Sequence, residues 1–286
     1  MPRTDQAKTD QALNVDEQPG RPPLVVLVHG SLDRAASFRR VVRRLAGQNV
    51  LTYDRRGYAR SRAAASDPGC RTGDEPGCRP AQDVPAGPPV RRGSADREVD
   101  AFDRHVQDLL ALIDGRESVV VGHSYGATIA LAAAMAHPPT LKAVGAYEPP
   151  LPWEPWWAPA RPNMLDLARP ELAAETFFRR VAGRRTWDRL PERTKEEIMQ
   201  DGAALVAETQ ALRMGGPRLA AEPIAIPVLL LRGEHSPSRL RRSVRELRAI
   251  IPGAEMSDLG GAGHGAHLTH PDAFAHFVLQ VVKLAR

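Results

Sequence analysis

One short stretch near the middle of the chain restricts the fold more than any other. Residues 118–122 form an apolar, β-branched-rich run, and residues 122–126 then read Gly-His-Ser-Tyr-Gly before a helix of small residues. A side chain at Gly122 or Gly126 would crowd the neighbouring strand or helix, so the pattern predicts a tight, strained turn. Such a turn lifts the Ser124 hydroxyl to the sheet edge and points the backbone N–H of Tyr125 at the same space.

Apolar runs typical of buried strands alternate with helical patterns along most of the chain. We expect strands at residues 24–28, 49–54, 118–122, 142–147, 227–231 and 255–259. Apolar residues spaced three and four apart predict helices at residues 38–45, 99–115, 238–251 and 271–285. Repeated strand–helix units predict an α/β fold with a mostly parallel, doubly wound sheet.

The strand pattern stops between residues 150 and 222, where helical stretches appear around residues 172–181 and 192–212. An insertion at this point predicts a helical cap over the carboxyl ends of the strands, where open α/β sheets bind ligands. The expected organisation is therefore a disordered segment at 1–22, a core at 23–150 and 223–286, and a cap at 151–222. Within the core, residues 58–95 lack periodicity and are expected to form a long surface excursion.

These features together resemble the α/β-hydrolase superfamily from residue 23 to the end of the chain. His29-Gly30 after the first strand resembles the family's oxyanion loop, and Gly263-His264 resembles its histidine loop. Residues 54–57, Asp-Arg-Arg-Gly, resemble its strand-end turn, in which Asp54 and Arg56 would form an ion-paired corner. The resemblance implies the α/β-hydrolase fold and a serine-nucleophile, esterase- or lipase-like branch.

The same resemblance assigns roles to individual residues. It makes Ser124 the nucleophile and His264 the general base, since neutral imidazole can take the hydroxyl proton near neutral pH. The backbone N–H groups of Tyr125 and Ser31, with Leu32 as the alternative to Ser31, would form the oxyanion hole. The side chain of His29 would only brace its loop.

Two further histidines, His267 and His270, compete with His264 for the role of base. With His264 they are spaced by three residues, which could suggest a metal site. The resemblance instead implies solvent-exposed or lid-facing positions for both, and no metal or cofactor is expected.

The acidic member of the triad departs from the commonest family pattern. Members usually carry Asp where this chain has Ser236, whose hydroxyl cannot stabilise an imidazolium by charge. Glu148 is the expected replacement, because it ends a strand in a Tyr-Glu-Pro-Pro sequence that resembles a subgroup with its acid there. Glu234 and Asp258 remain alternatives.

The predicted activity is hydrolysis of an ester, thioester or lactone of a small, largely apolar substrate through an acyl-Ser124 intermediate. Perhydrolase and C–C hydrolase chemistry use the same triad. A ligand-binding protein that has lost turnover is a further alternative, favoured by the missing Asp at position 236. Trp153, Trp156 and Trp157 either line an apolar acyl pocket or serve as packing.

Composition excludes several other classes of protein. The net charge of +5 comes mostly from arginines scattered along the chain, which argues against a nucleic-acid surface. No apolar run reaches membrane-spanning length, and residues 1–20 lack the apolar core of a secretory signal, so a cytoplasmic protein is expected. In that setting Cys70 and Cys78 are expected to be free thiols.

The N-terminal region differs from the family pattern, which opens with an antiparallel hairpin. Residues 1–21 show no alternating strand pattern, so the sheet is expected to start at an exposed edge. That edge could pair with another copy in a homo-oligomer, or the excursion at 58–95 could shield it.

Overall fold

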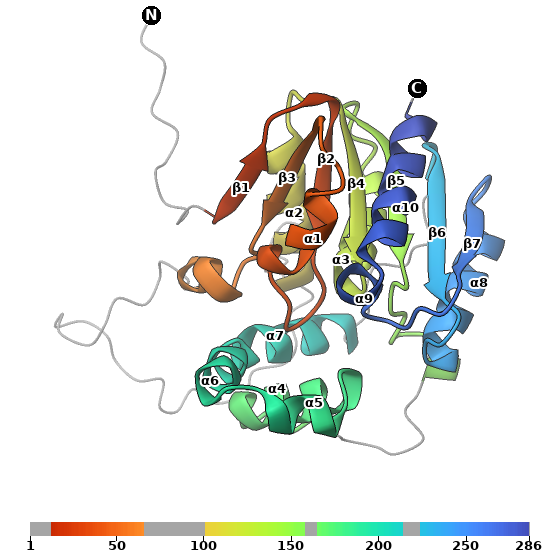
Figure 1. Cartoon of the computed structure of the whole chain (residues 1–286). Helices are drawn as coiled ribbons and strands as arrows, with labels where there is room; N and C mark the ends of the chain where they lie inside the picture. Colours follow the sequence, from red (N-terminus) through yellow and green to blue (C-terminus); the bar gives the residue numbers. More distant parts are fainter. Residues whose placement is uncertain (1–12, 66–100, 158–164, 214–223, 286) are drawn as a thin grey trace, which may run out of the picture.

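The computed structural model describes residues 13–65, 101–157, 165–213 and 224–285. These residues form a seven-stranded sheet of order β1-β3-β2-β4-β5-β6-β7 (Figure 1). The strands are β1 Val15–Gln18, β2 Arg21–Val28, β3 Gln48–Tyr53, β4 Ser118–His123, β5 Leu141–Tyr147, β6 Val228–Gly233 and β7 Glu255–Leu259. All neighbouring strands are parallel except β1, which runs antiparallel to β3.

Helices cover both faces of this sheet, as the alternating pattern predicts. The helices outside the predicted cap are η1 Ala35–Phe38, α1 Arg39–Val42, η2 Ala59–Ala65, α2 Ala101–Ile113, α3 Tyr125–Met135, α8 Ser238–Ile250, α9 Ala266–Thr269 and α10 Pro271–Leu284. Helices α1, α9 and α10 lie on one face, and α2, α3 and α8 on the other (Figure 1). The helix expected at 38–45 is shorter, because after Val42 the backbone tightens into turns that bond Arg44 to Val41 and Leu45 to Val42.

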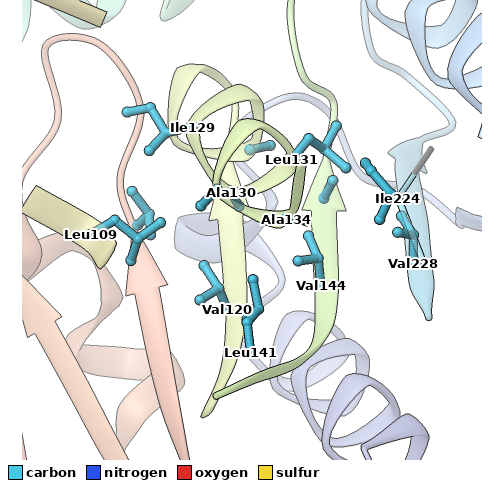
Figure 2. Close-up of a cluster of buried hydrophobic side chains, with 14 of the residues drawn as sticks. Leu109, Val120, Ile129, Ala130, Leu131, Ala134, Leu141, Val144, Ile224 and Val228 are labelled. Carbon is cyan, nitrogen blue, oxygen red and sulfur yellow. The ribbon is translucent and has the colours of Figure 1, made fainter. Parts of the chain in front are cut away.

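The core consists of two apolar clusters, one on each face of the sheet. Along β2, Leu24, Val26 and Val28 belong to the first cluster, whereas Val25 and Leu27 belong to the second. Figure 2 shows the first cluster, in which residues of α3 pack onto β4 and β5. Burial on both faces explains why the strand reads as a continuous apolar run without alternation.

Between β5 and β6, in the segment predicted as the cap, the described residues form the short helix η3 Pro155–Trp157 and, after it, four α-helices. They are α4 Pro170–Val181, α5 Arg184–Arg189, α6 Glu192–Gln200 and α7 Gly202–Arg213. Figure 1 shows them gathered beyond one end of the sheet. The fold class is therefore confirmed: an α/β-hydrolase fold with a mostly parallel sheet and an inserted helical cap.

The expectation for the N-terminal segment is wrong over its described part. Residues 13–22 are ordered, with β1 at Val15–Gln18 and β2 beginning at Arg21. The side chains of β1 are mostly exposed, so the strand is held by its backbone ladder with β3 and needs no alternating apolar pattern. The sheet therefore starts at a polar edge strand and not at β2.

Several other expectations fall on residues that the structure does not describe. Residues 1–12 and 66–95, with Cys70 and Cys78, lie outside the described ranges. Of the expected excursion, residues 59–65 form the short helix η2. Across the described ranges, no helix combines the length and apolar character needed to cross a membrane.

Candidate active site

Ser124 stands at the sharp turn between β4 and α3. Its backbone adopts φ 54° and ψ −123°, a sparsely populated conformation of the kind found at functional sites. A Cβ on Gly122 would lie 2.2 Å from the carbonyl oxygen of Gly126, and one on Gly126 would lie 2.2 Å from that of Val28. Only glycine fits at these two positions, so the predicted tight turn is confirmed.

His264 bridges Ser124 and Glu148, which come from distant parts of the chain. Its Nε2 lies 3.0 Å from Ser124 Oγ, and its Nδ1 lies 2.6 Å from Glu148 Oε2. Because the carboxylate can only accept, Nδ1 carries the imidazole proton and Nε2 is left as the acceptor toward the hydroxyl. The geometry is that of a nucleophile, a base and a group that orients the base.

Glu148 is fully buried, and its second oxygen is also engaged. Oε1 accepts a hydrogen bond from the backbone N–H of Gly233 at 2.7 Å. The residue has a positive φ of 50°, unusual for a glutamate, and its own N–H donates to the carbonyl of Leu231. Surrounding structure thus holds a strained backbone in place so that the carboxylate faces His264.

The two alternative acids lie elsewhere. Glu234 is exposed and accepts a hydrogen bond from the backbone N–H of Gly261 at 2.8 Å. Asp258 forms an ion pair with Arg232. Of the three candidate carboxylates, Glu148 is the one that contacts His264.

His267 does not have the exposed position expected for it. It is 2% exposed and packs with ring centroids 4.3 Å from His123 and 5.1 Å from Phe38. The expectation is wrong because α9 turns this side chain inward, where its Nε2 lies 3.2 Å from Asp33 Oδ2. His270 is partly exposed and lies within hydrogen-bond distance of Thr269.

His123 links this buried group to His264, the predicted base. Its Nε2 donates to the backbone carbonyl of His264 at 2.8 Å, which helps to fix the histidine loop. Burial, with the neighbouring His267 and His264, lowers the pKa of His123 well below its ordinary value. The ring is therefore neutral at physiological pH.

Among the described residues, Asp33, His123 and His267 form a group of three possible metal ligands, whose candidate atoms all lie within 4.8 Å of one another. The Asp33 carboxylate is already engaged, by the Ser37 hydroxyl at 3.1 Å and by the N–H of Arg34 at 2.9 Å. Burial would raise the pKa of Asp33, but its hydrogen bond and charge interaction with His267 hold it below the usual value. These contacts are those of a histidine–aspartate pair.

The loop after β2 passes directly beside Ser124. A Cβ on Gly30 would lie 3.0 Å from Ser124 Cβ, so the loop touches the serine. His29 braces this loop as predicted: its Nε2 accepts from the N–H of Arg55 at 2.9 Å and its Nδ1 donates to the Gly30 carbonyl. Burial and the charge of Arg55 lower the pKa of His29 to about 3, so it stays neutral.

The predicted oxyanion donors flank Ser124. Ser31 follows Gly30 in this loop, and Tyr125 is the first residue of α3, at the positive end of the helix dipole. Leu32, the alternative donor, has a positive φ of 52°. Both predicted donors therefore belong to segments that adjoin the serine.

Sequence reasoning missed the buried charges next to this loop. Arg55 is fully buried and pairs with Glu208 of the cap helix α7, which is 1% exposed. The turn at 54–57 is ion-paired, but with other partners than one another: Arg56 pairs with Asp108 at 2.7 Å and Asp54 with Arg60 at 3.7 Å. The sequence held one signal for Glu208: it is a glutamate that stands between two apolar stretches, residues 203–207 and 211–212.

Two of the three tryptophans, Trp156 and Trp157, lie beside α8. The guanidinium of Arg242 sits 4.4 Å from the ring centre of Trp156, and that of Arg239 sits 5.6 Å from that of Trp157. All three are partly buried and pack against the first core cluster. A role of these rings in substrate binding stays a prediction.

A cavity of about 770 Å³ opens in the cap region. Its lining comes from α4, the segment before it and the end of α7: Leu165, Asp166, Leu167, Arg169, Leu172, Glu175, Thr176 and Arg213. None of the residues predicted for the active site is among them.

A mostly parallel sheet with an inserted helical cap and a serine at the strand–helix turn defines an α/β hydrolase. Residues 25–277 match the model of the alpha/beta hydrolase family. The chain belongs to this family.

A relative with a similar sequence is also named a hydrolase. An uncharacterized hydrolase of Bacillus subtilis (strain 168), YraK, is 32% identical over 131 residues, which cover 46% of this chain and 38% of YraK. The match thus spans well under half of that relative.

Solved structures match over nearly the whole chain. The enol-lactonase from Burkholderia xenovorans LB400 superposes with a TM-score of 0.66 at 18% identity, covering 95% of this chain and 96% of its own. Est816, described as an N-acyl homoserine lactone degrading enzyme, gives 0.63 at 17% identity, covering 94% and 96%. At these identities the likeness shows the fold alone.

Proposed function

We propose that this protein is a serine hydrolase that cleaves an ester, thioester or lactone of a small, largely apolar substrate. The observation that carries the proposal is the pair of contacts made by His264, 3.0 Å to Ser124 Oγ and 2.6 Å to Glu148 Oε2. A serine hydroxyl is a weak nucleophile until a positioned base takes its proton.

The reaction follows from these positions. His264 Nε2 accepts the hydroxyl proton as Ser124 Oγ attacks the carbonyl carbon, and the buried carboxylate of Glu148 stabilises the imidazolium that forms. The protonated imidazole then gives its proton to the leaving alcohol or thiol, which generates the acyl-serine. Water then attacks the acyl carbon as His264 Nε2 takes its proton. The imidazolium returns that proton to Ser124 Oγ as the acid leaves.

The negative charge of the tetrahedral adduct requires donors beside Ser124. The backbone N–H groups of Ser31 and Tyr125 take this role in the proposal. Losing one such donor typically lowers turnover by about a hundred- to a thousandfold.

The substrate is proposed to bind where the cap meets the core, with residues 151–222 as cap and residues 23–150 and 223–286 as core. The named activities of the two structural neighbours, an enol-lactonase and an N-acyl homoserine lactone degrading enzyme, support a carbonyl substrate of the ester or lactone type.

Glu148 bears on the alternative of a binding protein without turnover. That alternative rested on Ser236 in place of an acid, and the contact of Glu148 with His264 supports a complete triad instead.

A panel of p-nitrophenyl esters, acyl thioesters and γ-lactones of increasing acyl length tests the proposal. We expect turnover of at least one class by the wild-type protein and loss of that turnover in Ser124→Ala. Wild-type protein that binds panel members but turns none over would support the binding alternative.

A further inference from the structure

We propose that Arg55 and Glu208 are positioning residues that orient the Ser31 peptide, the donor assigned above to the oxyanion hole, and tie it to the cap. The inference rests on the proposed hydrolase function. It adds to that function a physical link between cap helix α7 and the catalytic loop.

Arg55 holds the backbone of the loop on one side. Its Nε donates to the carbonyl of His29 and its Nη2 to that of Gly30, each at 2.9 Å. The carbonyl of Gly30 and the N–H of Ser31 belong to one planar, trans peptide unit, in which they point in opposite directions. Drawing the carbonyl toward Arg55 therefore turns the Ser31 N–H away from it.

The orientation of the Ser31 N–H matters for the reaction because the loop lies against Ser124, the proposed nucleophile. A Cβ on Gly30 would meet Ser124 Cβ at 3.0 Å and His123 Nδ1 at 3.1 Å. A peptide this close to the serine has to be fixed before the reaction, since an oxyanion donor that must reorient loses much of its effect.

Glu208 holds the same residue from the cap. Its Oε2 accepts hydrogen bonds from the Ser31 hydroxyl and from the Tyr58 hydroxyl, each at 2.7 Å. Its Oε1 accepts from Arg55 Nη1. One buried carboxylate thus connects the side chain of Ser31 to the arginine that holds its peptide.

The charges make this arrangement rigid. Burial by itself would raise the pKa of Glu208, but the charge of Arg55 and the hydrogen bonds of His105 and Arg55 lower it to about 2. The guanidinium of Arg55 also lies 4.7 Å from the ring centre of Tyr58 and 4.9 Å from that of Tyr125. A buried pair with this many partners resists rearrangement, because moving either charge alone would leave the other uncompensated.

Ser31→Ala is the decisive variant, because it removes the hydroxyl held by Glu208 but keeps the backbone N–H. With active sites counted by fluorophosphonate titration, we expect kcat per site to fall about tenfold while KM changes less than about threefold. The affinity for a trifluoromethyl ketone, which forms a tetrahedral adduct on the serine, should fall by a similar factor. Ser31→Thr, which keeps a hydroxyl, should restore both values.

Glu208→Gln should show the same split between kcat and KM. Its matched control is Glu197→Gln, because Glu197 of α6 also pairs with the loop after β2, through Arg34 at 3.0 Å, without touching Ser31. That control should retain wild-type kcat and inhibitor affinity. If Glu208→Gln does not fold, the Ser31 variants decide alone.

Wild-type kcat and inhibitor affinity in Ser31→Ala would overturn the positioning role and leave the hydrolase proposal standing. An equal loss in Glu197→Gln would also overturn it, because any cap contact would then have the same effect. A wild-type protein with neither turnover nor a fluorophosphonate adduct would overturn the proposed function and this inference together.

Discussion

The Oε1 atom of Glu148, at the end of β5, accepts a hydrogen bond from the backbone N–H of Gly233, at the end of β6, over 2.7 Å. In the commoner family pattern, the segment after this second strand carries the acid. Here it carries Ser236 and contributes a backbone donor to the carboxylate of Glu148, which we propose as the acid. The proposed acid therefore follows the preceding strand, and the next strand in the sheet donates a hydrogen bond to it.

Exchange of the two candidate acids for their amides tests this relationship. Glu148→Gln should lower kcat/KM by about a thousandfold or more, because a neutral amide cannot stabilise the imidazolium and can favour the wrong tautomer. Glu234→Gln is the matched control, since Glu234 lies two residues before Ser236 and its carboxylate accepts from the backbone N–H of Gly261. Equal losses, or a larger loss for Glu234→Gln, would reject the assignment of the acid.

The turn at Ser124 has a steric requirement that stability measurements can detect. Gly126→Ala would place a Cβ 2.2 Å from the Val28 carbonyl oxygen, so the strand or helix must shift. We expect a loss of about 1–3 kcal/mol or more in the free energy of unfolding by urea. Gly260→Ala, where a Cβ meets nothing within 4 Å, should leave it unchanged. Similar unfolding midpoints for both variants would contradict the crowding described here.

Buried neutral histidines predict a loss of stability in mild acid. Burial lowers the pKa of His29, His105 and His123 below the ordinary 6.5, with added effects of Arg55 or neighbouring histidines. The unfolded chain therefore binds more protons below pH 6.5, and each such group destabilises the fold by up to about 1.4 kcal/mol per pH unit. Urea unfolding at pH 7.5 and 5.5 should show clearly lower stability at pH 5.5, and equal stability would contradict these shifts.

The tryptophans after Glu148 give a prediction about substrate preference. If at least one of Trp153, Trp156 and Trp157 lines the acyl pocket, its change to Ala should lower kcat/KM for long acyl chains more than for acetyl. The contacts of Trp156 and Trp157 with arginines of α8 provide the competing explanation that they serve as packing. An unchanged chain-length profile in all three variants would favour packing alone.

Much of this fold could be predicted because burial leaves a direct pattern in the sequence. The strand at 24–28 and the helix α8 at Ser238–Ile250 appear where apolar periodicity places them. The turn around Ser124 was predictable because two glycines at fixed spacing have a steric reason to be there.

Other features left little pattern to read. The edge strand β1 is exposed and polar, so its pairing depends on the backbone and not on side-chain type. The inward position of His267 and the pairing of Arg55 with Glu208, 153 residues apart, arise from tertiary packing that local periodicity does not encode.

Peptide mapping by mass spectrometry after incubation with a fluorophosphonate tests whether His264 and Glu148 make Ser124 nucleophilic. We expect one adduct, on the peptide that carries Ser124, formed rapidly in the wild-type protein and much more slowly in His264→Ala. Folded wild-type protein with no adduct at Ser124, or with labelling of Ser124 that is equally fast without the imidazole, would contradict it.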